Sequence, residues 1–362
     1  MALSRIQNNS YEDTAVHGVR NLIINGAMQV AQRGTSTTGG GFLVDRFELN
    51  INNTDNIAIT QSQDSSGPSG FANSWKILAT TAESVVAADE RVRFRQNIEG
   101  QNLQQFAFGT SAAKSMTLSF YVKSNKTGTY AVNLEQDDAS RVIGSTYTIN
   151  AANTWEYKTI TVSGDTSGTI NNDNGVGLVV SWYLLAGSNY TSTDNTSYGA
   201  SANGKQAYGH STTWGQSTND DFYITGVQLE VGDTATPFEH RSYGDELARC
   251  QRYYYAIDQN TVGSIYTAFV GTGYSSTQCN FQVSFPVQMR VSPTMTYNSG
   301  SGFYRFYRNG TYDPFDVLQN DATSPLHANI ASNGGVSHSA GDCGTVQVRV
   351  ADGAGFQANA EL

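Results

Sequence analysis

Residues 222–231, FYITGVQLEV, place apolar side chains on two different strand faces within one short segment. The apolar positions are Phe222 and Ile224 before the glycine, and Val227, Leu229 and Val231 after it. Side chains of a β-strand alternate between its two faces, so a regular strand would bury only one of these sets. An extra residue at Gly226 restores the inward phase, as it does in a β-bulge. The sequence therefore predicts a buried strand with a bulge at Gly226.

The residues after this strand predict a corner and then the only helix of the chain. Pro237 removes a backbone donor and favours extended geometry at Thr236, which is typical of a corner. Ser242, followed three residues later by Asp245, resembles an N-terminal helix cap. Three further residues share one helical face: Leu247, Cys250 and Tyr254. We expect a connecting helix over residues 242–255.

Composition and periodicity predict an all-β chain. Charged residues make up only 14% of the sequence. Gly, Tyr, Ser, Thr and Asn are abundant instead, which suits short strands joined by tight turns. Strand patterns follow one another without intervening helices, so we expect packed antiparallel sheets. The predicted fold is a jelly-roll-like antiparallel sandwich over residues 21–241, then the short helix, and a second, smaller β-sandwich over residues 256–362.

Four other segments carry structural expectations. Residues 176–185 are apolar on both faces, which predicts a central strand covered on both sides. Residues 187–215 form a long polar loop, and a loop of that length is either functional or poorly ordered. Residues 309–310, Asn-Gly, predict a hairpin turn between aromatic arms. In a fourth segment, three arginines alternate with apolar residues: Arg91, Arg93 and Arg95. They either face solvent on the outside of a sheet or form a row that binds anions or a partner.

Charge and cysteine content exclude several classes of protein. The formal net charge of −10 argues against a nucleic-acid-binding surface, which needs clustered Lys and Arg. No apolar run is long enough for a transmembrane helix, and the first residues lack the apolar core of a secretion signal, so we expect no membrane insertion and synthesis in a cytoplasm. The three cysteines are widely spaced, which favours reduced core thiols: Cys250, Cys279 and Cys343. No His or Cys spacing indicates zinc, and we expect neither a metal nor another cofactor.

No arrangement of residues indicates catalysis. The five histidines lack the GxSxG or HExxH context of hydrolases. A glycosidase needs two carboxylates at a set separation across a cleft. The acidic pairs at residues 137–138 and 220–221 consist of sequence neighbours and are better explained as turn residues. We therefore expect that the chain is not an enzyme.

Aromatic residues in two regions indicate sugar binding. Exposed aromatic rings stack on sugars because the C–H face of a pyranose is apolar and the ring face is electron-rich. The long loop supplies Tyr190, Tyr198, Tyr208 and Trp214, and the predicted hairpin region supplies Tyr304, Tyr307, Tyr312 and Phe315. For each residue alone, packing in a core or interface is the alternative. As a set, they form the candidate glycan-binding site.

Several long motifs resemble segments of bacteriophage tail-fibre and other virion appendage proteins. They are GVQLEVG and ATPFEHRSYGDELARCQRYY, then NLIINGAMQVAQRG, EGQNLQQFAFGTSAAKSMTLSFYVKSNKTGTY and WYLLAGSNYT upstream, and FPVQMRVSPTMT downstream. The first domain also resembles the jelly-roll carbohydrate-binding modules of glycoside hydrolases, which often hold calcium through an acidic residue near the last strand. This chain has Thr225 and Gly226 where the acidic pair would stand, so we do not carry the metal over.

The resemblance implies a virion protein, made in the host cytoplasm, that mediates attachment to host cell-surface glycan. Residues 1–20 would be an arm that docks on a neighbouring virion protein, with terminal disorder as the alternative. The helix implies a homotrimer in which the face formed by Leu247, Cys250 and Tyr254 meets its partners. The second domain would be distal and bind host surface polysaccharide. The alternatives are a structural head-decorating or fibre protein without receptor function and, third, a depolymerase.

Overall fold

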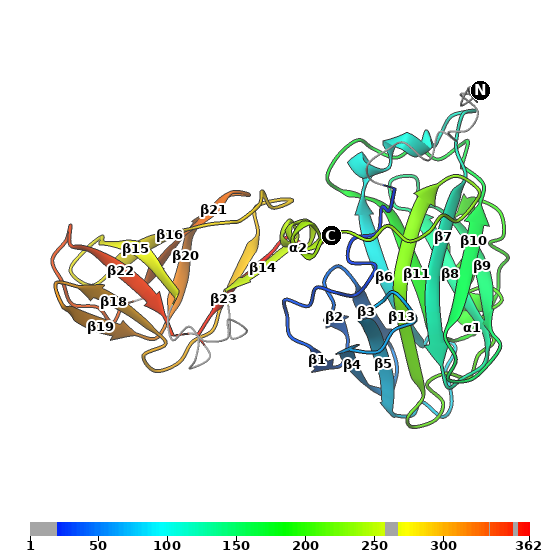
Figure 1. The fold of residues 1–362 in the computed structure, drawn as a ribbon, viewed down its shortest axis with the longest axis horizontal. Coiled ribbons are helices and arrows are strands. Elements are labelled where there is room, and N and C mark those ends of the chain that lie inside the picture. Colours follow the sequence, from blue (N-terminus) through cyan, green and yellow to red (C-terminus); the bar gives the residue numbers. More distant parts are fainter. Residues whose placement is uncertain (1–19, 258–266, 333, 350–353) are drawn as a thin grey trace, which may run out of the picture. The chain divides into compact units, whose positions relative to one another are not determined.

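The computed structural model describes residues 20–257, 267–332, 334–349 and 354–362, and the predicted arm over residues 1–20 lies outside them except for its last residue. The chain divides into two compact units. The first domain comprises Met1–Ala31, Thr35–Ser242 and Leu362, and the second comprises Gln32–Gly34 and Tyr243–Glu361. Both are built from antiparallel sheets, as predicted (Figure 1). No helix among the described residues is long and apolar enough to cross a membrane.

The first domain is a jelly-roll-like sandwich of two antiparallel sheets. The six-stranded sheet has the order β1 (Ser36–Thr38), β4 (Ala58–Asp64), β5 (Ser74–Thr81), β13 (Asp221–Val231), β7 (Met116–Ser124) and β10 (Glu156–Val162). The seven-stranded sheet has the order β12 (Gly199–Ala200), β9 (Arg141–Ile149), β8 (Gly128–Gln136), β11 (Val176–Ala186), β6 (Arg91–Glu99), β3 (Glu48–Asn52) and β2 (Gly41–Phe42). Short helical turns lie in the connections: η2 (Gly100–Asn102), η3 (Gln104–Phe106), α1 (Ser188–Thr191) and η4 (Asn203–Lys205).

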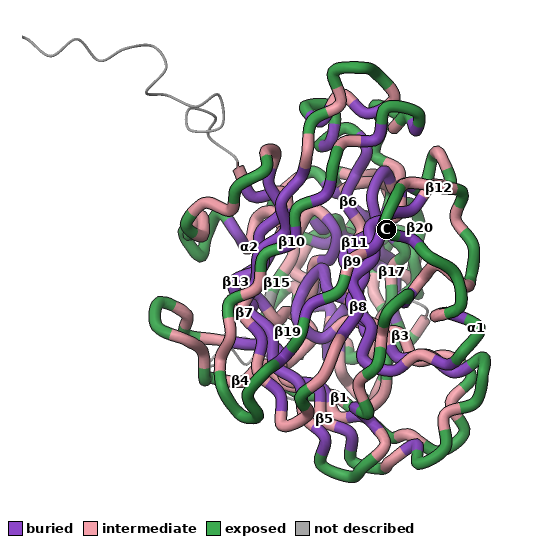
Figure 2. Tube along the Cα trace, turned by 90° about the vertical axis from the view of Figure 1, so that its right-hand side faces the viewer, coloured by how far each residue is buried: buried purple, intermediate pink, exposed green. Residues whose placement is uncertain are grey.

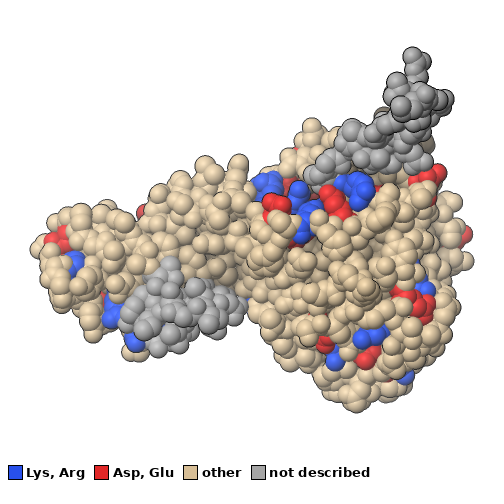
Figure 3. All heavy atoms as spheres, viewed as in Figure 1, with Lys and Arg blue, Asp and Glu red and all other residues tan. Residues whose placement is uncertain are grey.

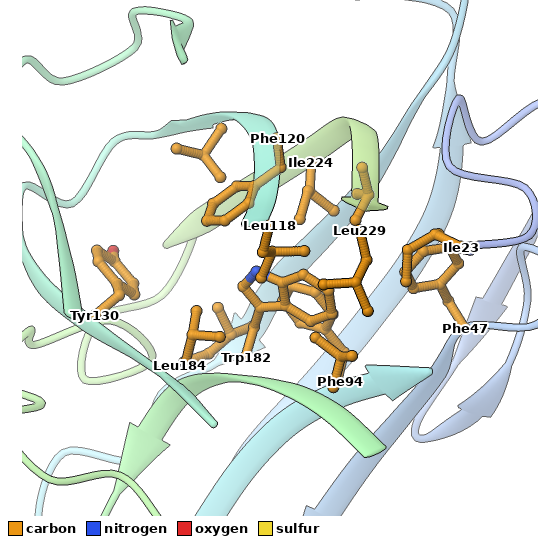
Figure 4. Packing of buried hydrophobic residues seen from close by; sticks show 14 of the residues in the cluster. Ile23, Phe47, Phe94, Leu118, Phe120, Tyr130, Trp182, Leu184, Ile224 and Leu229 are labelled. Atoms are coloured by element: carbon orange, nitrogen blue, oxygen red, sulfur yellow. The ribbon is translucent and has the colours of Figure 1, made fainter. Parts of the chain in front are cut away.

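Aromatic rings from both sheets fill the space between them. Trp182 on β11 stacks on Phe94 of β6, with ring centroids 5.1 Å apart and planes at 9°. Phe120 on β7 meets the same indole edge-on at 5.8 Å, so the two sheets interlock at this residue (Figure 4). Offset and edge-to-face contacts of this kind add to the free energy gained by burying the rings. Trp182 therefore lies at the centre of the core.

The bulge predicted in β13 is present. The register of β13 against β7 shifts between Thr225 and Gln228, and Gly226 adopts a φ of 63°. A side chain there would be strained, and its Cβ would lie 2.8 Å from the ring of Phe71. The apolar residues on both sides of the bulge are fully buried: Phe222, Ile224, Val227 and Leu229. The shift of the apolar positions at Gly226 in the sequence therefore corresponds, in the structure, to one continuous buried face of β13.

The segment before β1 closes the first domain by pairing with β13 beyond the bulge. The backbone N–H of Leu22 donates to the carbonyl of Leu229 at 2.9 Å, and the Asn21 side chain donates to the carbonyl of Val227 at 3.0 Å. Downstream, Arg241 donates to the carbonyl of Ile23 at 3.0 Å. Residues at the two ends of the domain are thereby tied together.

The second domain is a smaller β-sandwich. Its three-stranded sheet has the order β14 (Tyr254–Ile257), β23 (Phe356–Asn359) and β17 (Thr294–Tyr297). Its seven-stranded sheet has the order β19 (Thr311–Phe315), β18 (Tyr304–Arg308), β22 (Cys343–Val348), β15 (Thr267–Gly273), β16 (Cys279–Ser284), β21 (His327–Ser332) and β20 (Leu318–Thr323). The hairpin predicted at Asn309-Gly310 joins β18 and β19, and both turn residues have the positive φ values of its turn type.

The connecting helix is shorter than predicted. Helix α2 spans Tyr243–Gln251, and Tyr254 belongs to β14 instead. β14 pairs with β23 at the far end of the sequence, with Tyr254 opposite Asn359. A strand partner about a hundred residues away overrides the helical periodicity that continues locally past Gln251.

The prediction for residues 176–185 is confirmed, because β11 is central in its sheet and buried along nearly its whole length (Figure 2). One face of β11 contributes to the core. The other is covered by the long loop, where Tyr190 and Ala207 pack against Tyr183 and Ala131. The loop is pinned further by the carbonyl of Asn195, which accepts from the backbone of Gly144 at 2.8 Å. The loop thus serves as a cover for the sheet.

Candidate functional site

In the first domain, the structure turns most of the predicted sugar-binding aromatics inward. Trp214 is fully buried and belongs to the main core, so it cannot stack on a sugar. Tyr190 is only 8% exposed, because it packs beneath the long loop and its hydroxyl donates to the carbonyl of Asp89 at 3.1 Å. Tyr198 is half-buried against Phe108, and burial raises its pKa. Of these four residues only Tyr208, at 37% exposure, is exposed.

In the second domain, the predicted aromatics divide by strand face. Tyr304 and Phe315 stack at 5.6 Å in the core, and the Tyr304 hydroxyl donates to the carbonyl of Asn298 at 2.5 Å. Burial raises the pKa of Tyr304 to about 12. Tyr307 and Tyr312 lie on the opposite face and are 42% and 52% exposed. Tyr304 and Phe315 are therefore core residues, which was the alternative to sugar binding. Tyr307 and Tyr312 are not part of the core.

The exposed tyrosines begin a row of side chains that crosses the outer face of the seven-stranded sheet of the second domain. Tyr312 on β19 is directly opposite Tyr307 on β18, and Tyr307 is opposite Thr345 on β22. Thr345 is in turn opposite Val270 on β15, whose side chain is 79% exposed. Directly paired residues project from the same face of a sheet, and neighbouring strands lie about 4.8 Å apart, so the row is roughly 14 Å long. We call Tyr312, Tyr307, Thr345 and Val270 the tyrosine row.

Two arginines set the environment of the tyrosine row. The guanidinium of Arg305 lies 4.8 Å from the ring centroid of Tyr312, within the range of a cation–π contact. Arg308 forms ion pairs with Asp313 at 2.9 Å and with Asp342 at 3.1 Å. Hydrogen bonds from the Ser339 backbone and from Arg308 lower the pKa of Asp342. These pairs connect β18 and β19 to the loop before β22 and so restrain the hairpin.

An open depression of about 350 Å³ adjoins the row at Val270. Its lining is mainly hydroxyl and amide side chains, with one carboxylate: Thr272, Asn280, Gln282, Asn329 and Asp321, besides Val270 and Phe281. Amide groups both donate and accept hydrogen bonds, so they can pair with either role of a sugar hydroxyl. The outer face of this sheet therefore combines two exposed aromatic rings with a polar depression.

The predicted oligomer face does not lie free on the surface of the helix. Cys250 is fully buried, and Tyr254 is 3% exposed and belongs to β14. Leu247 is half-buried. The first two side chains are occupied within their own chain, which removes the helical face from which the threefold interface was inferred. The homotrimer itself stays a prediction.

The remaining sites predicted or excluded from the sequence can be placed among the described residues. Within them, no group of three His, Cys, Asp or Glu side chains is arranged to hold a metal ion. Cys250 and Cys279 are buried free thiols, and burial raises the pKa of Cys279 to about 11. Cys343 is also free but exposed, which corrects its assignment to the core, because it begins β22 on the outer side.

The arginines of β6 are neither fully solvated nor unpartnered. Arg91 donates to Asn52 at 2.9 Å, Arg93 to the Tyr183 hydroxyl at 3.4 Å, and Arg95 pairs with Glu48 at 2.7 Å. All three are half-buried on the outer face of the first domain's seven-stranded sheet. These contacts make the row a structural network, which fits neither alternative considered from the sequence.

Sequence reasoning missed a second group of aromatics, on the outer face of the six-stranded sheet of the first domain. The group includes Tyr121, Tyr157 and Tyr223, from three strands that are adjacent only in the folded sheet. The alternation of residues along β7 alone indicates that Tyr121 points away from the core. The register that brings the three together is not visible in any local pattern.

No family model and no curated protein matches the sequence. The chain is similar to several solved structures, all at low sequence identity. The chain is similar to the enzymatically active domain of bacteriophage CBA120 tailspike protein 4, at 14% identity and a TM-score of 0.32, over 58% of this chain and 21% of that one. This chain thus spans about a fifth of the tailspike chain. It is also similar to TmCBM61 in complex with β-1,4-galactotriose, at 11% identity, a TM-score of 0.30 and coverage of 59% and 99%. A third likeness is to the CBM22-1 xylan-binding domain of Paenibacillus barcinonensis Xyn10C, at 10% identity, a TM-score of 0.28 and coverage of 59% and 96%.

Proposed function

We propose that this chain is a non-catalytic, glycan-binding protein of a bacteriophage tail fibre or similar virion appendage, and that its second domain contacts polysaccharide on the host surface. The observation that carries the proposal is the tyrosine row. Tyr307 and Tyr312 are exposed, project from one face and are held by a restrained hairpin. The resemblance of several motifs to segments of phage appendage proteins supports the biological setting.

Binding would combine stacking with hydrogen bonding. A pyranose ring lies against Tyr307 or Tyr312, where its C–H groups meet the electron-rich ring face. Arg305 beside Tyr312 offers fixed N–H donors to hydroxyl or ring oxygens of the same sugar. The amides around the depression bind the hydroxyls of the next sugar units along the chain. Because the supporting hairpin is restrained by Arg308, little ordering of the protein is needed on binding.

Replacement of both exposed tyrosines tests the proposal. We expect the double variant Tyr307→Ala/Tyr312→Ala to bind bacterial surface polysaccharides, displayed on an array, roughly 30-fold more weakly than the wild type, because each stacking contact contributes about 1 kcal/mol. The full-length chain is used in both cases. The control is Tyr274→Ala, which removes a 71% exposed tyrosine of the same domain outside the row.

Each outcome decides a separate part of the proposal. Equal binding by the double variant and the wild type would rule out the tyrosine row as the site. Absence of wild-type binding to every polysaccharide on the array, and to bacterial cells, would remove the glycan-binding function. The phage role is tested by labelling virions with antibody against the chain, where label on the tail supports it and label on the capsid contradicts it.

A further inference from the structure

The outer face of the first domain's six-stranded sheet carries a group of aromatic and lysine side chains. An outer face that packs against another protein would carry aliphatic residues instead. Exposed hydroxyl residues lie on the neighbouring edge strand, Thr159 and Thr161 on β10, whereas Thr117 and Ser119 on β7 are buried. We call the group the aromatic–lysine surface, and it comprises Lys76, Tyr121, Lys123, Trp155, Tyr157 and Tyr223. On the face drawn in Figure 3, most of the surface belongs to uncharged residues.

The strand register brings these residues together in two neighbouring rows. Tyr223 on β13 has Lys123 of β7 opposite it on one side and Lys76 of β5 on the other. Two residues away, Tyr121 on β7 is opposite Tyr157 on β10. Directly paired residues, and residues two apart on one strand, share a face of the sheet. The six side chains therefore form one continuous surface across four strands.

Both lysine amines converge on the ring of Tyr223. The Nζ of Lys123 lies 4.0 Å from its centroid and 5.1 Å from that of Trp155, and the Nζ of Lys76 lies 5.4 Å from Tyr223. These distances are within the range of cation–π contacts. The ring contacts continue across the surface, with Trp155 and Tyr223 at 6.2 Å and Tyr121 and Tyr157 at 4.8 Å. The rings hold the two positive charges in place.

Neither amine forms an ion pair with any described residue of the protein. Two carboxylates, Asp64 and Asp221, act on Lys76 through longer-range attraction. Both carboxylates already accept hydrogen bonds, from the backbone N–H of Ser66 at 2.9 Å and of Asn125 at 2.8 Å. The two amines flank the Tyr223 ring from the strands on either side of β13, so a carboxylated ligand on this surface would find an ammonium group on each side of the ring.

One side of this surface is accessible, whereas Tyr223 at its centre is only 9% exposed. Tyr157 is 45% exposed, and Trp155 is partly exposed whereas the other three tryptophans of the chain are fully buried. Stable protein–protein interfaces are more apolar at their centre and contain few lysines. Aromatic rings, hydroxyls and amines together match the C–H faces, hydroxyls and carboxylates of an acidic sugar chain. A polysaccharide is therefore the better-matched occupant.

We propose that the aromatic–lysine surface is a second glycan-binding site, selective for polysaccharides that bear carboxylate groups. It is separate from the tyrosine row, lies in the other domain and does not depend on the function assigned there. Sugar rings stack on Trp155 and Tyr157, and the carboxylates pair with Lys76 and Lys123. Binding at this site weakens as salt concentration rises, because its lysines are partly exposed to solvent.

The test measures binding of the full-length chain to carboxylated polysaccharides (polyuronates and sialylated chains) and to the neutral polysaccharide dextran on one array. Binding of the wild type in solution is also followed by tryptophan emission, to which Trp155 contributes the only partly exposed indole, and the variants are compared on the array, because the test variant lacks this reporter. The test variant is Lys123→Gln/Trp155→Phe. The matched control is Lys114→Gln/Tyr274→Phe, which replaces an exposed lysine of the same domain and an exposed tyrosine that lies outside both proposed sites. Thermal unfolding of each variant confirms that the domain is folded.

We expect the wild type to bind at least one carboxylated chain, with a change in tryptophan emission and no response to dextran. The test variant should bind it at least about tenfold more weakly, a loss of about 1.4 kcal/mol, and the control should match the wild type. Equal binding by test variant and wild type would overturn the site, as would absence of wild-type binding to every carboxylated chain. Binding lost only in Tyr307→Ala/Tyr312→Ala would overturn this inference while supporting the tyrosine row.

Discussion

Gly26→Ala is expected to destabilise the first domain by about 3 kcal/mol, which lowers its unfolding temperature by roughly 10 °C. A Cβ at residue 26 would lie 2.1 Å from the carbonyl oxygen of Val227 and 3.1 Å from its carbon. Both atoms belong to the backbone of β13, so no side-chain rotation relieves the overlap. The N–H of Val227 also donates to the carbonyl of Gly26 at 2.9 Å, and this bond is broken if the segments separate.

Tryptophan fluorescence measures this effect in the intact chain, because all four tryptophans lie in the first domain. Gly226→Ala is a useful comparison, since its Cβ would meet only side chains, the closest at 2.8 Å, although the φ of 63° adds backbone strain. Gly244→Ala is the control, because nothing lies within 4 Å of its Cβ. An unchanged unfolding temperature in Gly26→Ala would show that the closing segment does not pack tightly on β13.

The stability of the first domain is expected to fall as the pH decreases from about 6.5 to about 4, by about 3 kcal/mol from His210 alone. Both ring nitrogens of this histidine are buried, and its ring packs edge-on against Tyr130 at 5.9 Å. Burial lowers the pKa of His210 to about 4, although the backbone of Leu184 partly offsets this effect. The unfolded chain has the higher pKa and takes up the proton first, so stability is complete above the unfolded pKa and is lost below it.

Denaturant unfolding at a series of pH values, again followed by tryptophan emission, checks this expectation. The variant His210→Phe should lose the part of the pH dependence that lies between 6.5 and 4. His240→Gln, at an exposed histidine of the same domain, is the control and should retain it. Identical pH profiles for the wild type and His210→Phe would contradict the assignment. Since His210 lies within the long loop, its protonation should also loosen the cover that the loop forms over β11.

Much of the fold could be predicted because the determining features are local. The parity change around Gly226 specifies a bulge, and Asn309-Gly310 specifies a hairpin, whatever the rest of the chain does. The end of α2 could not be predicted in the same way. The residues after Gln251 retain helical periodicity, and only the pairing of β14 with β23 draws them into a sheet.

Prediction of the candidate site from the sequence was limited in the same way. Aromatic content correctly drew attention to the hairpin, yet Tyr304 and Tyr307 differ only in the face from which they project. The first residue of β18 is buried and the fourth is exposed, and the sequence assigned both to one set. The aromatic–lysine surface was missed for a different reason. Lys76, Lys123 and Tyr223 come from strands up to about 150 residues apart, and only the register of β5, β13 and β7 places them side by side.

The closure of the first domain by its own ends has a consequence for how the protein is made. Asn21 donates its backbone N–H to the Glu239 side chain at 2.6 Å across 218 residues of sequence. At a translation rate of about 5–20 residues per second, the ribosome needs roughly 10–40 s to supply the second partner after the first. During that time β5, β7 and the segment before β1 wait for β13, which pairs with all of them. The half-made sandwich therefore exposes unpaired strand edges during synthesis, and folding is completed only once the strand with the bulge has emerged.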